Sequence, residues 1–462
     1  MKSVKFSSVV TTPKLILTLI FVGCLSAFHF ETYLTWDASF HLFSILQYKD
    51  FFLMINRQSM ALFQAPLVAY LHLTELPILG TAKNLYGSIY AFIPFFTLLA
   101  GRVMLKSATN AFFLFSISAT LPVLYLQLHF LSEHLIACQL YTLMLIALIP
   151  QHFSSAYWRL FSLAMAYFIY WLHPVSIFLL GLHGLFILTL EIKYQKKGHL
   201  YSLSFLAMAL MRLGLMLKTT HSTAQVTTVS PLGSRGLKLL NGIYPNEHIF
   251  FLFLILISIF PFIYLRAKKD DKKIYYFLCV SGAIYFFWLF KFHMGIQFAL
   301  ELRHFLFLIS TPYYIIFFKS FVIPSEETIE RIEGTNKTKY IALLTSIFFT
   351  FSLFFTGFDY KQDLSKLDTH IKNENKVCYE GHRLNLQLKN RNWTMWTTFF
   401  EYVMYKETRD ISIFLAGVNS CNDIKNYKKV LRYVDPNVYD FPYFKISLVD
   451  KNADFNKKQE NR

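Results

Sequence analysis

Long runs of apolar residues, separated by short polar segments, dominate the first 357 of the 462 residues of this chain. A run of roughly 20 apolar residues is long enough to cross the hydrocarbon core of a bilayer as a helix. By this criterion the pattern predicts about eleven membrane-spanning helices. They are expected over residues 15–30, 86–103, 111–129, 135–150, 157–171, 175–190, 201–217, 249–265, 274–290, 305–321 and 340–355. The predicted fold class is therefore a polytopic α-helical membrane protein.

Two long loops and a tail interrupt this pattern. Residues 31–85 contain apolar clusters that are too short to span, and these clusters suit amphipathic helices lying on the membrane face. Residues 218–248 are rich in Thr, Ser and Gly and are typical of a flexible loop. From residue 358 to 462 the composition shifts to Lys, Asn and Asp. We expect two units, a membrane domain over 1–357 and a small α+β domain over 358–462.

Short strands and one helix are predicted in this tail. The strands are expected over 377–379, 411–415 and 444–448, and the helix over 392–406.

Basic residues gather on alternate loops between the expected spans. If the N-terminus is cytoplasmic, the inner loops hold clusters such as Lys193, Lys196 and Lys197, whereas the outer loops around Glu133 and Trp171 hold no Lys or Arg. This asymmetry follows the positive-inside rule. An odd number of spans then places the tail outside, and we expect a multi-pass protein of the cell inner (plasma) membrane. The N-terminus also fits a signal peptide, but without a convincing cleavage site an uncleaved first span is favoured.

Composition supports the membrane interpretation. Only 16% of residues are charged and the mean hydropathy is +0.39, whereas soluble domains carry about 25% charged residues. The formal net charge of +17 does not indicate nucleic acid, because no basic stripe accompanies a soluble recognition fold. Basic loops that set topology and meet anionic membrane lipids explain the charge better.

The cysteines and glycines indicate neither a metal site nor a nucleotide site. Cys24, Cys138 and Cys279 lie inside apolar runs, whereas Cys378 and Cys421 lie in the tail and would be able to form a disulfide in an oxidising compartment. No Cys/His spacing resembles a zinc site. No glycine-rich phosphate loop or dinucleotide fingerprint occurs. We therefore expect no metal and no cofactor.

Asp37 stands directly after the first apolar run. A carboxylate at the mouth of a span is costly unless it is solvated or faces a cavity. Asp37 and His41 are four residues apart and would share one face of a helix. Asp37 either caps a helix that starts at Ala38 or acts as a general base on an acceptor hydroxyl or amine. The residues alone favour neither interpretation.

Further polar residues lie at the same expected depth. Glu133 and His134 occupy a short outer loop, where they are either a solvated turn or part of a site shared with Asp37. His173 precedes a proline that starts the next helix, so a turn is the favoured interpretation. Arg212, inside an apolar run, either snorkels to the surface or faces a cavity and meets an anion.

Arg303 and His304 begin the tenth expected span. They are either interfacial anchors or ligands for a phosphate of a lipid-linked substrate, for which arginine is well shaped. The candidate substrate-binding residues are therefore His41, His134, His173, Arg212, Arg303 and His304, and the candidate catalytic residues are Asp37 and Glu133.

In their order along the chain these features resemble the membrane glycosyltransferases of the GT-C superfamily, which include protein O-mannosyltransferases and aminoarabinose transferases. The matching features are an acid after the first span (Asp37), a proline motif in the same loop (Phe63–Tyr70), an acid before the fourth span (Glu133), and an Arg-aromatic span with a later proline (Arg303, Pro312). The chain departs from the usual pattern in two places. Ala38 replaces the second acid of the first loop, and Gln64-Ala65-Pro66 replaces His-Pro-Pro.

The resemblance implies a GT-C-like fold and inverting transfer of a sugar in the cell envelope. The donor would be a polyprenyl-phosphate-linked sugar, and the acceptor a lipid, glycan or protein on the outer face of the membrane. Asp37 would be the base, Glu133 would position substrate, and Arg303 with Arg212 would hold the donor phosphate. Two other hypotheses stay open, a transporter or flippase for a lipid-linked or anionic substrate and a non-catalytic membrane scaffold. The sequence offers no clear inverted repeat to support the transporter.

Overall fold

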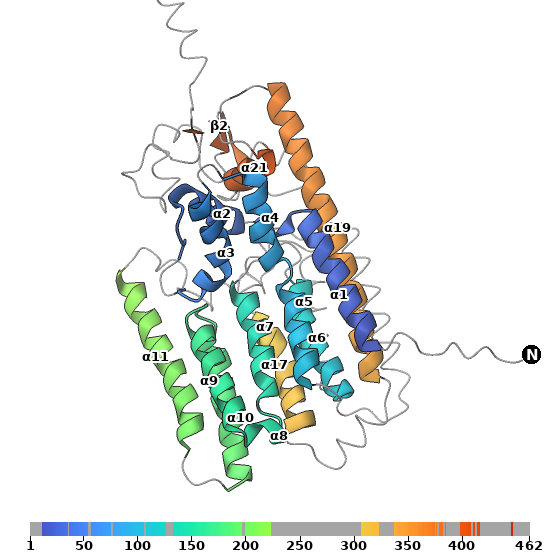
Figure 1. Ribbon diagram of the computed structural model, residues 1–462, viewed down its shortest axis with the longest axis vertical. Helices are drawn as coiled ribbons and strands as arrows, with labels where there is room; N and C mark the ends of the chain where they lie inside the picture. Colours follow the sequence, from blue (N-terminus) through green and yellow to red (C-terminus); the bar gives the residue numbers. More distant parts are fainter. Residues whose placement is uncertain are drawn as a thin grey trace, which may run out of the picture.

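The computed structural model is a helical bundle that carries a small strand-containing tail at one end (Figure 1). It describes residues 12–35, 37–53, 57–74, 77–105, 108–125, 133–195, 199–222, 306–322 and 337–374, and in the tail 376, 378–381, 384, 398–407, 410–411, 414–415 and 445–446. The helices are α1 (Thr12–His29), α2 (Asp37–Tyr48), α3 (Met60–Leu73), α4 (Leu79–Tyr90), α5 (Ile93–Leu105), α6 (Thr109–Tyr125), α7 (Glu133–Ile146), α8 (Pro150–Phe153), α9 (Ala156–Tyr170), α10 (Ser176–Lys193), α11 (Leu200–Ser222), α17 (Leu306–Phe317), α19 (Lys337–Glu374) and α21 (Thr398–Lys406). A 3₁₀ turn follows α1 (η1, Thr32–Leu34) and a π turn follows α17 (η2, Phe318–Val322).

Four segments of the described chain are long and apolar enough to cross a membrane, as a helical membrane protein requires. They are Thr12–His29, Leu79–Leu105, Ser176–Lys193 and Thr338–Glu374. The predicted total of eleven stays a prediction, because the expected spans 249–265 and 274–290 lie outside the described residues.

The expected spans within the described residues lie mainly on helices, but the span expected over 86–103 is divided between α4 and α5. The second span begins at Leu79 rather than at residue 86, because α4 runs almost directly into α5. The last helix, α19, continues unbroken to Glu374, well past residue 358 where we expected the tail to begin. The tail is therefore joined to the bundle by a continuous helix.

Figure 1 shows that α1 and α9 finish, and α7 and α10 begin, at the end of the bundle that carries α21 and β2. We call this the tail end. The helices run back and forth between this end and the opposite one, as short loops between successive spans require.

Helices α1 and α19 pack closely along the bundle. The hydroxyl of Thr350 donates a hydrogen bond across the interface to the carbonyl oxygen of Leu19, at 2.7 Å. A Cβ atom on Gly23 would lie 2.8 Å from the Phe349 ring and 3.1 Å from the Cα atom of Thr350. Small residues that let two backbones approach are typical of helix contacts in membranes.

Replacing Gly23 by Ala should lower the free energy of unfolding by about 2 kcal/mol, because the backbone of α19 cannot move aside. Thermal unfolding in detergent measures this effect. Gly181→Ala in α10 is the matched control, since an added Cβ there meets no described atom within 4 Å. Equal melting temperatures for the two variants would contradict the close packing of α1 on α19.

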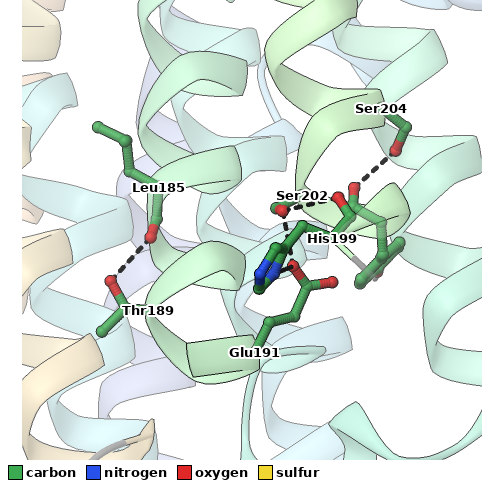
Figure 2. A network of polar contacts seen from close by, with 7 residues as sticks. Leu185, Thr189, Glu191, His199, Ser202 and Ser204 are labelled. Atoms are coloured by element: carbon green, nitrogen blue, oxygen red, sulfur yellow. Dashed lines mark hydrogen bonds and ion pairs between the residues drawn. The ribbon is translucent and has the colours of Figure 1, made fainter. Parts of the chain in front are cut away.

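Helices α10 and α11 form a hairpin at the opposite end, and its polar contacts are drawn in Figure 2. The buried carboxylate of Glu191 accepts a hydrogen bond from the Ser202 hydroxyl at 2.6 Å and lies 3.2 Å from Nδ1 of His199. Because Ser202 belongs to the first turn of α11, the carboxylate faces the positive end of that helix. We interpret this network as a structural link between the two helices.

The tail packs on the bundle through α21. The Phe400 ring lies 5.0 Å from the rings of both Phe40 and Phe43 in α2. Beyond the apolar part of α19, Asp368 accepts a hydrogen bond from the Tyr402 hydroxyl at 2.9 Å and lies 3.0 Å from Lys406. Lys372 lies 2.8 Å from the same carboxylate, so two lysines and Tyr402 together satisfy Asp368.

Two pairs of short parallel strands complete the described part of the tail. β1 (Cys378–Tyr379) pairs with β3 (Phe414–Leu415), and β2 (Asp410–Ile411) pairs with β4 (Lys445–Ile446). β1, β3, β4 and α21 lie within the ranges predicted from the sequence, whereas β2 begins at Asp410, one residue before the predicted range 411–415. The predicted strand over 411–415 is in fact two strands, β2 and β3, which belong to different pairs.

Cys378 in β1 is disulfide-bonded, whereas Cys24 and Cys138 are free thiols. The chain has five cysteines, so the partner of Cys378 is Cys279 or Cys421. Both of these residues lie outside the described residues. The pairing of Cys378 with Cys421 therefore stays a prediction.

Helices α2 and α3 occupy the first long loop, where we expected amphipathic helices on the membrane face. α2 is not half-exposed, because every residue from Ala38 to Gln47 is buried, including the polar His41 and Gln47. The tail helix α21 packs on α2 and covers it. The expected half-exposed helix is therefore wrong for α2, whereas α3 has one buried face, which includes Met60, Gln64 and Leu67, and one exposed face.

Candidate functional site

Polar side chains from five parts of the chain gather at the tail end of the bundle. We call this group the tail-end cluster. Its members are His41 of α2, Arg57 in the loop before α3, Glu133 and His134 at the start of α7, His173 between α9 and α10, and Arg212 of α11. The side chains of His41, His134 and Arg212 are nearly inaccessible to solvent. Buried polar groups in an apolar bundle are costly and are usually functional.

An ion pair lies at the centre of the cluster. Nη1 of Arg57 lies 2.8 Å from Oε1 of Glu133, and the Glu133 side chain is only 7% exposed. Glu133 is also the first residue of α7, where the helix dipole favours a negative charge. Because so little water reaches the pair, removing either partner would leave a poorly solvated charge. The pair also ties the loop before α3 to α7.

Arg212 places a second guanidinium group close to the first. Its central carbon lies 5.4 Å from the ring centroid of Tyr170 and 5.8 Å from that of Trp171. The backbone N–H of Ser59, two residues after Arg57, donates a hydrogen bond to the carbonyl oxygen of Trp171 at 3.3 Å, so the loop that holds Arg57 lies beside the residue that Arg212 contacts. The two arginines therefore belong to one cluster, in which their like charges repel each other. Since like charges are held together only at some cost, a site of this kind is a candidate for an anionic ligand.

The rings of His134 and His173 stack with their centroids 5.0 Å apart. Nδ1 of His173 accepts a hydrogen bond from the backbone N–H of Val175 at 3.1 Å. This contact shapes the turn that the sequence indicated before Pro174, and it also directs the ring towards His134. The turn interpretation and the binding interpretation of His173 are therefore compatible.

The start of α2 lies at the same cluster. His41 interacts electrostatically with Glu133, and its ring centroid lies 5.2 Å from that of Phe52. Asp37 is the first residue of α2, about one helical turn before His41. The capping and the general-base interpretations of Asp37 both stay predictions, because both place this residue at the start of a helix. The side chain of Asp37 lies outside what the structure describes.

The structure brings together five of the eight residues proposed from the sequence. These five are His41, Glu133, His134, His173 and Arg212. Arg303 and His304 lie outside the described residues, so their part in the site stays a prediction. Among the described residues, no group of three or more His, Cys, Asp or Glu side chains is placed to hold a metal ion.

Arg57 is a member of the cluster that the sequence did not single out. It is the only Lys or Arg between Lys49 and Lys83, and all three residues belong to the loop that we expected to be outer. The local sequence pattern therefore does not set Arg57 apart from these basic neighbours.

A smaller polar group lies inside the bundle, away from the tail-end cluster. The Ser162 hydroxyl and Nε2 of His183 are 3.0 Å apart, and the ring centroid of Tyr141 lies 5.8 Å from that of His183. All three side chains are fully buried. Titratable groups in the middle of a membrane bundle occur in transport pathways as well as in structural contacts.

Comparison with protein-family models, with curated proteins and with solved structures finds no match for this chain. Any assignment of function therefore rests on the residues and their geometry.

Proposed function

We propose that this chain is a membrane glycosyltransferase of the GT-C type that acts at the tail-end cluster. It takes a sugar from a polyprenyl-phosphate carrier and transfers it to a lipid, glycan or protein acceptor. The observation that carries this proposal is the pair of neighbouring guanidinium groups, Arg57 and Arg212, at the end of an apolar bundle. A lipid-linked phosphate has a negatively charged head, which the guanidinium groups would bind, and an apolar tail, which the apolar helices would accommodate.

The cluster has the groups that the chemistry requires. The acceptor hydroxyl or amine attacks the anomeric carbon, Asp37 takes its proton, and the bond from that carbon to the phosphate oxygen breaks. Polyprenyl phosphate leaves with the electron pair of that bond. Arg57 and Arg212 stabilise the charge that develops on the leaving phosphate, a task for which guanidinium groups are well shaped. Attack from the face opposite the phosphate inverts the configuration of the sugar.

Glu133 and the histidines have supporting roles in this scheme. Glu133 fixes the position of Arg57 through their ion pair. His41, His134 and His173 offer ring nitrogens to the sugar hydroxyls. Arg303 and His304, which precede α17 in the sequence, would add to the phosphate contacts.

The proposal also assigns the two ends of the bundle to opposite sides of the membrane. We infer eleven spans, a position in the cell inner (plasma) membrane and an extracytoplasmic tail. The disulfide at Cys378 supports this inference, because disulfides persist in oxidising compartments. Arg159 and Lys193 at the opposite end of the bundle fit a cytoplasmic face.

A carrier for a lipid-linked anion is the second candidate. The buried group around His183 and Ser162 favours it, because a transport path needs polar contacts within the bundle. A carrier would move its substrate intact, whereas a transferase breaks the bond between sugar and phosphate.

Replacing Arg212 by Met should raise the KM for the donor about tenfold, because one of two cations on the phosphate is lost. Donor consumption by the purified protein in proteoliposomes, with a radiolabelled polyprenyl-phosphate sugar, measures this change. Arg102→Met is the matched control, since Arg102 also lies over an aromatic ring, that of Phe112, but belongs to the last turn of α5. Equal KM values for the two variants would remove Arg212 from the donor site.

A further inference from the structure

A buried lysine joins the bundle to the tail at the tail end. Lys83 of α4 is 2% exposed, and its Nζ lies 2.9 Å from Oε1 of Glu31 and 2.7 Å from Oε1 of Glu407. The same nitrogen donates a hydrogen bond to the carbonyl oxygen of Met404 at 3.1 Å. Glu31 follows α1, whereas Met404 belongs to the last turn of α21 and Glu407 directly follows that helix. One ammonium group therefore joins α4 to two segments that are far from it in the sequence.

The backbone at both carboxylates is unusual. Glu31 has φ 59° and Glu407 has φ 50°, and each stands just after the end of a helix, α1 or α21. Glycine or asparagine is the usual residue in this left-handed position, because a Cβ atom is unfavourable there. Glutamate is therefore not the residue that the backbone favours at either position, and at both positions its carboxylate contacts Lys83.

The clamped helix α21 in turn holds α2. The Phe400 ring packs on Phe40 and Phe43, which lie on either side of His41 in the sequence of α2. Phe40 also packs on Phe52, with the ring centroids 5.1 Å apart. Contacts thus lead from Lys83 through α21 to the helix that begins with Asp37.

We propose that Lys83, Glu31 and Glu407 form a clamp that holds α21 in place. Through the Phe400 ring, the clamped α21 keeps α2 in its position beside the other residues of the tail-end cluster. Lys83 is then a positioning residue for Asp37 and His41, although it belongs to neither the donor nor the acceptor site. The effect on transfer rests on the function proposed above. The ordering of α2 by the clamp does not depend on that function, and a separate experiment measures it.

The left-handed backbone provides a clean test of the clamp. Glu31→Gly and Glu407→Gly remove the carboxylates but keep residues that suit positive φ. Gln195→Gly is the matched control, because Gln195 also has a positive φ, 48°, just after the end of α10. Amide hydrogen exchange of the full-length protein in proteoliposomes reports on α21 and α2 directly.

In Glu407→Gly the amides of α21 and of α2 should exchange about tenfold faster than in the wild type, and in Gln195→Gly they should not change. Lys83→Met should show the same pattern and Lys83→Arg should largely restore protection, since arginine keeps the charge. Faster exchange in α21 with unchanged α2 would overturn the positioning role. Unchanged exchange in both helices would overturn the clamp itself.

Transfer kinetics complete the test. The clamp variants should lower kcat about tenfold and leave the KM for the donor unchanged, because the phosphate contacts are intact. Full activity with a loosened α2 would overturn the positioning role. If the wild type transfers no sugar, the proposed function fails, and the exchange of α2 still decides whether the clamp exists.

Discussion

Replacing Asp37 by Asn should lower the rate of sugar transfer about a thousandfold while the protein still inserts and folds. General-base catalysis contributes roughly 10²- to 10⁴-fold to such reactions, and an amide of the same size cannot take the proton. Asp37 begins α2 one turn before His41, which interacts with Glu133. The loss should therefore fall on kcat, because the donor phosphate is held by other residues. Single-turnover transfer in proteoliposomes measures it.

The control for this variant is Asp50→Asn. Asp50 is an exposed residue just after α2, and its carboxylate accepts a hydrogen bond from the next backbone N–H, at 2.6 Å. It should keep wild-type transfer. Transfer at the wild-type rate by Asp37→Asn would remove Asp37 from the mechanism and leave it as a residue of the helix start.

Glu133→Gln should have the second largest effect, a decrease in transfer of about a hundredfold and a loss of about 3 kcal/mol in stability. The substitution removes the charge that opposes Arg57, which then faces Arg212 without its ionic partner. An amide can still accept a hydrogen bond from Arg57, so the local shape is largely kept. Thermal unfolding in detergent and transfer in proteoliposomes measure the two effects.

The double variant Arg57→Gln with Glu133→Gln separates stability from chemistry. It removes both charges of the pair, so it should recover most of the lost stability, because neither buried charge is left alone. It should not recover transfer, since one of the two cations on the phosphate is gone. Recovery of transfer together with stability would show that the ion pair is only structural.

Much of the bundle was predictable from the sequence, because whether a segment can span a membrane depends on the residues of that segment alone. An apolar run long enough to cross a bilayer forms a helix in almost any context, since its backbone groups must bond to one another. Helices α6, α7, α9 and α10 accordingly begin and end within a few residues of their predicted limits. The burial of α2 was not predictable in this way, because α21, which covers it, lies some 350 residues later in the chain.

The candidate site was predictable to the extent that its residues stand out locally. Glu133, His134 and Arg212 are conspicuous because each is polar beside or within an apolar run. Arg57 and Lys83 are not, because their roles depend on carboxylates far away in the sequence, including Glu407. A pattern of hydrophobic and polar positions contains no information about such partners.

The most direct test of the central claim is the chemical fate of a radiolabelled polyprenyl-phosphate sugar in proteoliposomes that contain the wild-type protein and a mixture of lipid, glycan and peptide acceptors. The proposal predicts that the label leaves the phosphate, appears on an acceptor with inverted anomeric configuration, and stays on the carrier when Asp37 is replaced by Asn. Movement of the intact donor across the bilayer without cleavage of the bond between sugar and phosphate would contradict the proposal and identify a carrier instead.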